Sequence, residues 1–299
     1  MDILRGTQLF VEVLANGQSK FQVLEGRVVM NNPHGKLELA AGEAGEALPG
    51  QPPRKTAAIV TTNLLQWALY YPAVLEPSEL DLSDAERRAF AQSLEAYRAG
   101  DLPGALECFP EGSGAGPGAQ LYEAGVLLGV GRVEEAWAAL GRVALDHPGR
   151  RALERMIAAV KFMEEEEWER DSLQTTGEAL AESYYLQSRS DLAGAREAAR
   201  RAATLAPGNG YAWARLAELE FSFARNREAS AALSKALRLA PANAQAHALR
   251  GFILSAENRI EEAADSFEEA VRLDGALGNG WLGLGLTKIK RGDLEGGRG

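Results

Sequence analysis

The side chains that most often carry out chemistry are few in this sequence and lie far apart. Its histidines are His34, His147 and His247, and Cys108 is its single cysteine. Their spacing matches no metal-binding motif, because zinc ligands recur within a few residues of one another. One cysteine also excludes a disulfide within the chain. No Ser/His/Asp or Cys/His constellation stands out, so we expect no catalytic residues, no metal and no other cofactor.

Two glycine-rich segments resemble phosphate-binding loops only superficially. The first, "GSGAGPG" (112–118), follows no predicted strand and carries no Lys-Ser/Thr, and the second, "GLGLTK" (283–288), has the wrong spacing. We interpret the first as a connection between helices and the second as part of a helix. The acidic run 164–167 is interpreted as a solvated helix end, with a site for a cation or a basic partner as the alternative.

Charge and hydropathy exclude some classes of protein. The net charge of −10 argues against a non-specific nucleic-acid binder, which needs a basic face. No run of about 18 apolar residues is present, so we expect no membrane span in this chain, and the first ten residues do not have the pattern of a signal peptide. Residues 1–59 are neutral and the remainder carries the whole negative charge, which indicates two different modules.

From residue 78 onward the sequence repeats at a fixed interval. Pro207, Pro241 and Gly275 are each 34 apart, and so are three sets of residues around them: Ala202, Ala236 and Ala270; Ala195, Ala229 and Ala263; Trp213, His247 and Trp281. Proline ends helices, and a recurring unit of about 34 residues is typical of stacked helix–turn–helix repeats. This pattern resembles the tetratricopeptide repeat (TPR) family, which implies a mainly α fold, a TPR-type α-solenoid.

The register predicts complete repeats at 176–209, 210–243 and 244–277. A fourth repeat starts at Gly278 and is truncated after one helix, 117–150 fits the same template, 86–110 fits it weakly, and 151–163 forms the first helix of an irregular repeat. Ala263, Phe267 and Ala270 share one helix face, so we expect the two alanines to let the first helix of the same repeat approach while Phe267 fills the space between the helices. Arg250-Gly251 and Leu284-Gly285 supply small residues in the facing first helices. Both chain ends look cut within larger modules.

The resemblance implies that the first helices of the repeats line an inner groove. At the ninth and twelfth positions of each repeat lie eight candidate partner-binding residues: Tyr184, Gln187, Glu218, Phe221, Phe252, Ser255, Leu286 and Ile289. Apolar anchors at these positions could hold a peptide, and Glu218 together with the net charge suggests a neutral or basic one. Packing of the same side chains against the next repeat is the alternative.

Residues 1–50 form a different module. Short β-branched segments separated by turns such as Asn16-Gly17 and Asn32-Pro33-His34-Gly35 predict a small, incomplete antiparallel β module. Arg5-Gly6-Thr7, "VLEGRV" (23–28) and Ala41-Gly42-Glu43 resemble the C-terminal part of a FecR-type domain, and an unrelated β-meander is the alternative. Residues 51–77 are predicted to be a linker or arm in which Trp67, Tyr70 and Tyr71 either pack on a neighbour or form an exposed docking peptide.

We therefore predict domains at 1–50, 51–77 and 78–299, and a non-enzymatic scaffold that binds a protein or peptide. The alternatives are a FecR-type envelope signalling protein and a non-catalytic fragment of a larger enzyme. The FecR resemblance implies a bacterial protein in the periplasm or cell envelope, and a cytoplasmic location is the alternative. The identity of the partner and the oligomeric state do not follow from the residues.

Overall fold

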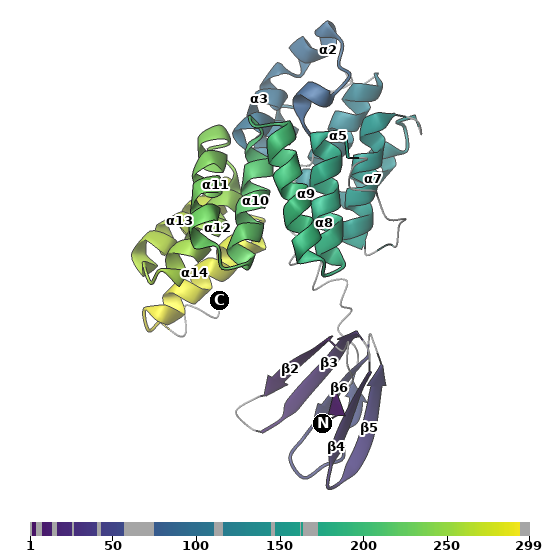
Figure 1. Ribbon diagram of the computed structural model, residues 1–299, viewed down its shortest axis with the longest axis vertical. Coiled ribbons are helices and arrows are strands. Elements are labelled where there is room, and N and C mark those ends of the chain that lie inside the picture. The colour runs from purple at the N-terminus through teal and green to yellow at the C-terminus, as the bar shows by residue number, and fades with distance from the viewer. Residues whose placement is uncertain are drawn as a thin grey trace. The chain divides into compact units, whose positions relative to one another are not determined.

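The computed structural model describes residues 2–3, 8–13, 17–25, 27–40, 43–56, 75–110, 116–144, 147–161, 163 and 173–293. The chain divides into two compact units, Met1–Leu69 and Tyr70–Gly299 (Figure 1). The first unit contains strands and the described part of the second contains helices. Each unit is considered by itself.

The first unit consists of two antiparallel sheets. One has the strand order β1-β4-β5 and the other β2-β3-β6-β7. The strands are β1 (Asp2–Ile3), β2 (Gln8–Val13), β3 (Ser19–Glu25), β4 (Arg27–Asn32), β5 (Gly35–Ala40), β6 (Ala44–Ala47) and β7 (Arg54–Thr56). A small core of Val23, Val28, Met30 and Leu39 joins them. The predicted antiparallel β module is confirmed, and at its β4–β5 turn the Asn32 side chain accepts hydrogen bonds from the backbone N–H groups of His34 and Gly35.

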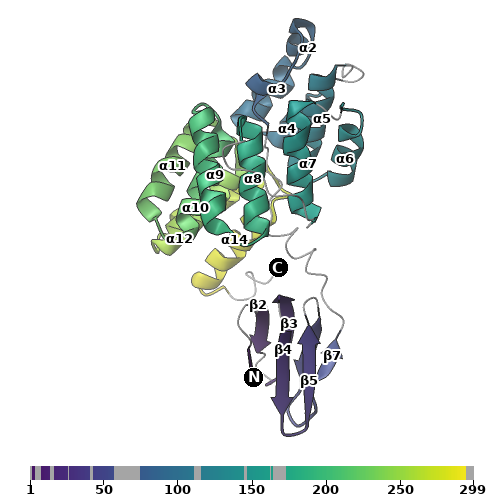
Figure 2. The same cartoon turned by 45° about the vertical axis from the view of Figure 1, so that its right-hand side comes forward.

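The second unit is a TPR-type α-solenoid, as the repeat pattern predicts (Figures 1 and 2). Its N-terminal part contains the 3₁₀ helix η1 (Pro77–Glu79), α2 (Asp84–Ala89), α3 (Ala91–Ala99), α4 (Leu102–Glu107), α5 (Pro117–Gly129), α6 (Val133–Leu140) and α7 (Pro148–Lys161). The regular repeats follow as the pairs α8 (Thr176–Ser188) with α9 (Leu192–Leu205), α10 (Gly210–Ser222) with α11 (Asn226–Leu239), and α12 (Ala244–Ala256) with α13 (Ile260–Leu273), then α14 (Gly278–Lys290). We call α7, α8, α10, α12 and α14 the inner helices.

One aromatic ring and two glycines join the last three helices. Phe267 on α13 is buried, with Ala263 and Ala270 on either side of it. A Cβ on Gly251 of α12 would lie 2.6 Å from the Phe267 ring, and one on Gly283 of α14 would lie 2.1 Å from it. The ring therefore fills a slot between its own repeat and the next one. On α14 the glycine beside the ring is Gly283, just before the Leu284-Gly285 pair that the sequence singled out.

The recurring aromatic position has a hydrogen-bonding role. The indole N–H of Trp213 donates to the carbonyl of Pro207 at 3.0 Å, and that of Trp281 donates to Gly275 at 2.9 Å. The intervening His247 contacts the Pro241 carbonyl through Nε2 at 2.8 Å. Donor and acceptor both recur with the repeat period, so each of these side chains ties the start of an inner helix to the preceding turn.

A left-handed residue follows each regular inner helix. Ser190, Ala224, Asn258 and Gly292 have φ values of 65°, 56°, 61° and 90°, and they occupy the same position in successive repeats. Glycine adopts this conformation without strain, whereas alanine does so at a cost.

Replacing Ala224 with glycine is therefore expected to raise the free energy of unfolding by about 0.5–1 kcal/mol. Ala224 is exposed, so the substitution leaves little packing to lose. Gly292→Ala, at the equivalent position, is the matched variant and should have the opposite effect. Urea denaturation of both would check the prediction, and changes of the same sign in the two variants, or a loss of stability in Ala224→Gly, would contradict it.

The irregular repeat arises where two inner helices pack directly. Arg151 of α7 pairs with Glu178 of α8 at 3.7 Å, and Arg155 pairs with Glu182 at 2.8 Å. Ala158 and Ala159 pack against Tyr185. The separation between partners in the sequence stays the same along the pair, so α7 and α8 run parallel, and the helix expected over 151–163 is confirmed as α7. Of the connecting residues 162–175, only 163 and 173–175 are described.

The N-terminal helices are joined by buried tyrosines. Tyr97 of α3 contacts Tyr122 of α5 and Tyr211 of α10, with ring centroids 5.8 and 5.3 Å apart. The Ser93 hydroxyl donates to the Ala105 carbonyl at 2.6 Å, so at 2.8 Å it must accept from the Tyr122 hydroxyl. Burial raises the pKa of Tyr122 to about 12, although the Ser93 hydrogen bond opposes the shift.

This pKa predicts a loss of stability in alkali. An unfolded tyrosine ionises near pH 10, so between about pH 10 and 12 the folded state holds a proton that the unfolded state releases, and stability falls as pH rises. We expect Tyr122 to account for a loss of about 2 kcal/mol in the free energy of unfolding between pH 9 and pH 11.5. Urea denaturation at both pH values would test this against Tyr122→Phe, in which the pH-dependent loss should be smaller by that amount. An equal loss in both proteins would contradict the prediction.

Candidate partner-binding surface on the inner helices

The eight candidate residues lie in the C-terminal halves of α8, α10, α12 and α14. Because the repeats keep a constant period, these side chains take equivalent places on successive inner helices. Their exposure differs: Tyr184 is only 5% exposed, whereas Leu286 and Ile289 are 45% and 41% exposed. The remaining five are half-buried: Gln187, Glu218, Phe221, Phe252 and Ser255. We call these eight residues the inner surface.

Tyr184 of α8 and Glu218 of α10 are both held by a buried arginine of α10. The Arg215 guanidinium lies 3.8 Å from the centre of the Tyr184 ring. Arg215 also donates to the hydroxyl and the carbonyl of Ser183 at 2.9 and 3.0 Å, and pairs with Glu218 at 3.0 Å. Burial raises the pKa of Tyr184 well above the usual range for a phenol. These contacts join α8 to α10, so Tyr184 packs within the solenoid. The Glu218 carboxylate is paired with Arg215.

Phe252 and Ser255 on α12 are also engaged with neighbouring helices. The Phe252 ring meets the Phe267 ring edge-on, with centroids 4.9 Å apart. The Ser255 carbonyl accepts from the Lys290 ammonium of α14 at 3.2 Å. Phe252 keeps part of its surface open, so it belongs both to the packing described above and to the inner surface.

The most exposed apolar part of this region is α14. Beside Leu286 and Ile289, Trp281 and Leu282 are exposed, and neither was predicted from the sequence to be a partner-binding residue. The repeat period gives no signal for the exposure of Leu282, because it places this residue where the preceding repeat has Ala248, which is fully buried, whereas Leu282 is 52% exposed. Residues 282, 286 and 289 lie four and three apart and therefore share one face of the helix.

Residues 75–82 cover the N-terminal ends of α5, α8 and α10. Glu79 accepts from the backbone N–H groups of Thr176 and Gly177 at the start of α8, at 2.7 and 3.3 Å. Glu76 accepts from the side chain of Asn209, the residue that caps α10. A Cβ on Gly118 of α5 would lie 2.2 Å from the Asp81 carbonyl oxygen. The end of the predicted arm is thus packed on the solenoid, whereas Trp67, Tyr70 and Tyr71 lie outside the described residues.

Among the glycine-rich segments, the acidic run and the single cysteine, only "GLGLTK" contributes to the inner surface, through Leu286. Pro117-Gly118 of "GSGAGPG" begins α5, "GLGLTK" lies within α14, and residues 112–115 and 164–167 lie outside the described part of the chain. Cys108 is exposed. Among the described residues there is no group of three or more His, Cys, Asp or Glu side chains that could hold a metal ion. In the same part of the chain, no helix is both long and apolar enough to cross a membrane.

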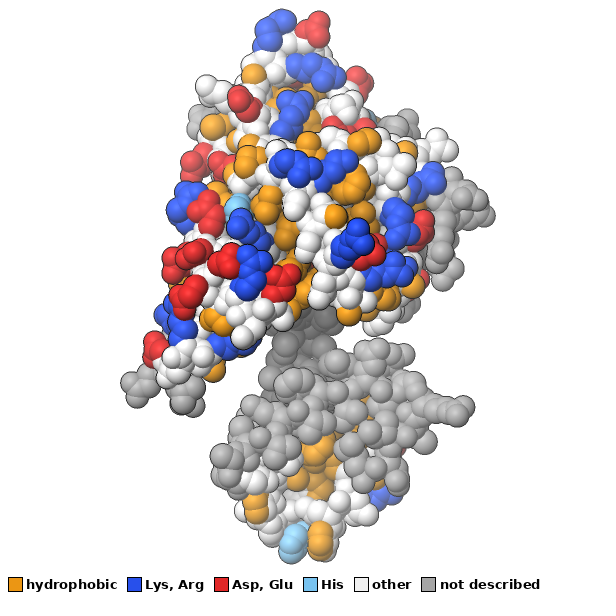
Figure 3. Space-filling model, turned by 60° about the vertical axis from the view of Figure 1, so that its left-hand side comes forward, with side chains coloured by type: hydrophobic (Ala, Val, Ile, Leu, Met, Phe, Trp, Pro, Cys, Tyr) orange, Lys and Arg blue, Asp and Glu red, His pale blue; other side chains and the backbone are white. Residues whose placement is uncertain are grey.

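Positively and negatively charged side chains are interspersed on one face of the helical unit. On the face shown in Figure 3, Lys and Arg side chains alternate with Asp and Glu, and apolar side chains lie between them. This face therefore presents no continuous field of one sign (Figure 3).

Comparison with known proteins supports the fold. No protein-family model matches the chain, and no curated protein sequence does. Among solved structures, the Cut9–Hcn1 hetero-tetramer of the APC/C has a TM-score of 0.52 at 15% identity, over 80% of this chain and 50% of that one. A MamA structure has a TM-score of 0.39 at 15% identity, over 52% of this chain and 91% of the other. A tetratricopeptide repeat protein from Parabacteroides merdae ATCC 43184 has a TM-score of 0.42 at 19% identity, over 67% and 82%.

At such identities the likeness establishes the fold alone. The chain shares a tetratricopeptide-type α-solenoid with the Cut9 structure. The resemblance of residues 1–50 to FecR-type domains gains no support from the family comparison.

Proposed function

We propose that this chain is a non-catalytic scaffold that binds a protein or peptide along its inner surface. The observation that carries the proposal is the line of equivalent positions on α10, α12 and α14, where Phe221 and Phe252 are half-buried and Leu286 and Ile289 are exposed. Exposed apolar side chains that lie together on a protein surface commonly mark an interaction site.

The packing beneath this line supports its use as a rigid platform. Arg215 fixes α8 against α10, and Phe267 fixes α12 against α14. A surface that is already ordered loses little conformational entropy when a partner binds. Full burial of one Leu or Ile side chain contributes roughly 1.5–3 kcal/mol, so Leu286 and Ile289 could supply a substantial part of a micromolar affinity.

The proposal is tested by capture of partners with the whole chain and with Leu286→Asp/Ile289→Asp. The matched control is Trp137→Asp/Leu192→Asp, which places the same charges at two other exposed apolar side chains, on α6 and α9. Circular dichroism must first show equal helicity in all three proteins. We expect at least one protein to be enriched tenfold or more by the parent and the control and lost from the α14 variant. If no captured protein depends on Leu286 and Ile289, the proposal is wrong.

The β unit supports a second, finer proposal. We infer from the resemblance of residues 5–7, 23–28 and 41–43 to FecR-type domains that the chain belongs to a bacterial envelope protein that acts outside the inner membrane. The antiparallel strands β3 to β6 agree with such a module, although residues 4–7, 26 and 41–42 lie outside the described ones. Fractionation of the producing cells with an antibody against the chain would test this, and recovery in the cytoplasmic fraction alone would contradict it.

A further inference from the structure

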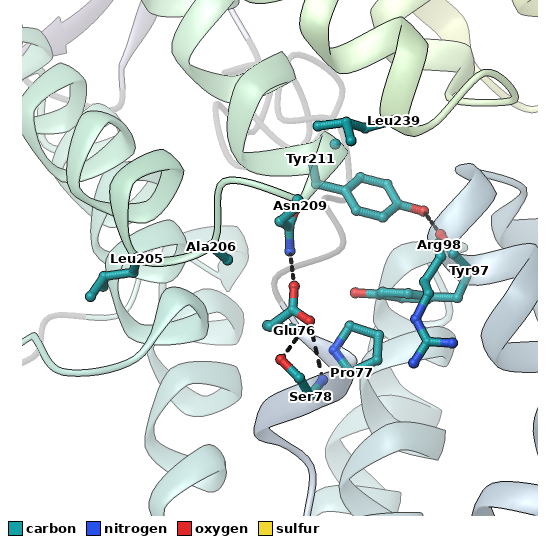
Figure 4. A pocket seen from close by; sticks show the side chains of 12 residues that line it. Glu76, Pro77, Ser78, Tyr97, Arg98, Leu205, Ala206, Asn209, Tyr211 and Leu239 are labelled. Carbon is teal, nitrogen blue, oxygen red and sulfur yellow. Dashed lines mark hydrogen bonds between the residues drawn. The ribbon is translucent and has the colours of Figure 1, made fainter.

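A pocket of about 430 Å³ lies at the N-terminal end of the inner helix α10 (Figure 4). Four parts of the helical unit form it: η1, the end of α3, the segment from the end of α9 to the start of α10, and the end of α11. Its principal lining residues are Glu76, Pro77, Tyr97, Arg98, Leu205 and Tyr211. The volume falls within the range of small-molecule sites and is ample for one large side chain of a partner.

The walls of the pocket are held in place by hydrogen bonds between its own residues. The Tyr211 hydroxyl donates to the Tyr97 carbonyl at 2.7 Å, and the Asn209 amide donates to Glu76 at 2.9 Å. The Ser78 backbone N–H and hydroxyl donate to the other oxygen of Glu76 at 3.1 and 2.8 Å (Figure 4). The pocket is thus preformed, and three donors offset the negative charge of Glu76.

Apolar side chains and one cation line the rest of this partly polar pocket. Pro77, Leu205 and Leu239 supply apolar walls, and Leu205 is itself exposed. Arg98 is exposed and makes no hydrogen bond or ion pair with any residue that the structure describes. A guanidinium at the edge of an apolar pocket favours a ligand that is apolar at one end and anionic beside it.

We propose that this pocket binds a large apolar side chain of a partner peptide, and that Arg98 pairs with an acidic side chain adjoining it. This inference rests on the proposed scaffold function and adds a second contact region. The inner surface lies in the C-terminal halves of the inner helices, whereas the pocket lies at the N-terminal end of α10. A partner that reaches both would gain affinity through two linked contacts.

The pocket is tested directly with blocked, fluorescently labelled peptides of the sequence Gly-Gly-Phe-Glu-Gly-Gly, and with versions in which Phe-Glu is replaced by Phe-Lys or Ala-Glu. Their binding is measured by fluorescence anisotropy as the full chain is added up to millimolar concentrations. We expect the Phe-Glu peptide to bind at least tenfold more tightly than the Phe-Lys and Ala-Glu peptides. Unlabelled 3-phenylpropanoate carries the same phenyl group and carboxylate without a peptide backbone. It should displace the Phe-Glu peptide if these two groups alone are sufficient for binding. Failure of the competitor with retention of the peptide would assign the site to peptides.

Two protein variants separate the two halves of the proposal. Arg98→Glu should weaken the Phe-Glu peptide at least tenfold and reverse the preference toward Phe-Lys. Gly208→Trp should abolish binding by filling the pocket, because Gly208 lines it and a Cβ there meets nothing within 4 Å. Arg227→Glu, the same charge change at an exposed arginine of α11, is the control and should change affinity less than twofold.

The proposal is overturned if no peptide binds, if the three peptides bind equally, or if Arg98→Glu and Arg227→Glu have the same effect. Leu286→Asp/Ile289→Asp should leave these short peptides unaffected, so loss of pocket binding and loss of the inner surface are distinguishable. A folded α14 variant that still binds the Phe-Glu peptide but captures no partner would contradict the scaffold mechanism while leaving the pocket in place.

Discussion

Replacing Glu182 with leucine is expected to lower the free energy of unfolding by about 3–5 kcal/mol, because it removes the carboxylate that pairs with a buried arginine. Arg155 has no exposed surface, and its Nε and Nη2 atoms each lie 2.8 Å from the Glu182 carboxylate. The Arg155 guanidinium also lies 3.5 Å from the centre of the Tyr185 ring. The Arg155 charge cannot reach water unless α7 separates from α8. The loss of stability should therefore be largest where these two helices pack.

An exposed pair of the same kind provides the control. Arg132 and Glu135 are joined at 2.6 Å but both are exposed, so Glu135→Leu should cost far less stability than Glu182→Leu. Urea denaturation would give the free energies, and amide hydrogen exchange should show the largest loss of protection in α7 and α8. Arg155→Met/Glu182→Leu should recover most of the lost stability, since it removes both charges and keeps much of the volume. A cost for Glu182→Leu no greater than that of Glu135→Leu would contradict the assignment.

The repeat pattern was sufficient to predict the regular helices. Prolines and small residues recur at fixed positions from Ala195 to Ala270, because each repeat must end its helices and admit a neighbouring helix at the same places. The structure accordingly has α8 to α14 where the period predicts helices. The caps at Ser190, Ala224 and Asn258 also obey the period, but none of these residues is the glycine that usually signals such a cap, so they were missed.

The surface of the solenoid was harder to predict than its helices. The period identifies which positions share a face, but not whether a long side chain from the next repeat covers them. Arg215, which lies on the inner helix after that of Tyr184, covers the Tyr184 ring and holds Glu218. The direct packing of α7 on α8 departs from the period, and the pocket combines Glu76 and Arg98 with residues from the much later turn between α9 and α10. Contacts of this kind depend on how distant segments meet in three dimensions.

Replacing Phe267 with alanine is expected to lower the free energy of unfolding by about 3–5 kcal/mol, because it empties the slot between α12 and α14. The ring is 1% exposed, and a Cβ on either Gly251 or Gly283 would fall well inside contact distance of it. A cavity bounded by two helix backbones cannot collapse fully, since each backbone is held by its own hydrogen bonds. The half-exposed Phe252 rests on the same ring, so this variant should also disturb the inner surface.

Overpacking of the same slot gives the complementary result. Gly283→Ala places a methyl group 2.1 Å from the ring and should cost about 1–3 kcal/mol, although alanine favours the helix by nearly 1 kcal/mol. Phe267→Leu/Gly283→Ala should then cost less than the sum of its two single changes, because the smaller side chain makes room for the new methyl group. Gly275→Ala, whose Cβ would come no closer than 3.8 Å to its nearest neighbour, is the control and should change stability by less than about 0.5 kcal/mol. Urea denaturation of these variants measures the coupling directly. Strict additivity would show that Phe267 and Gly283 do not share the slot, and the packing assigned to α13 and α14 would then be wrong.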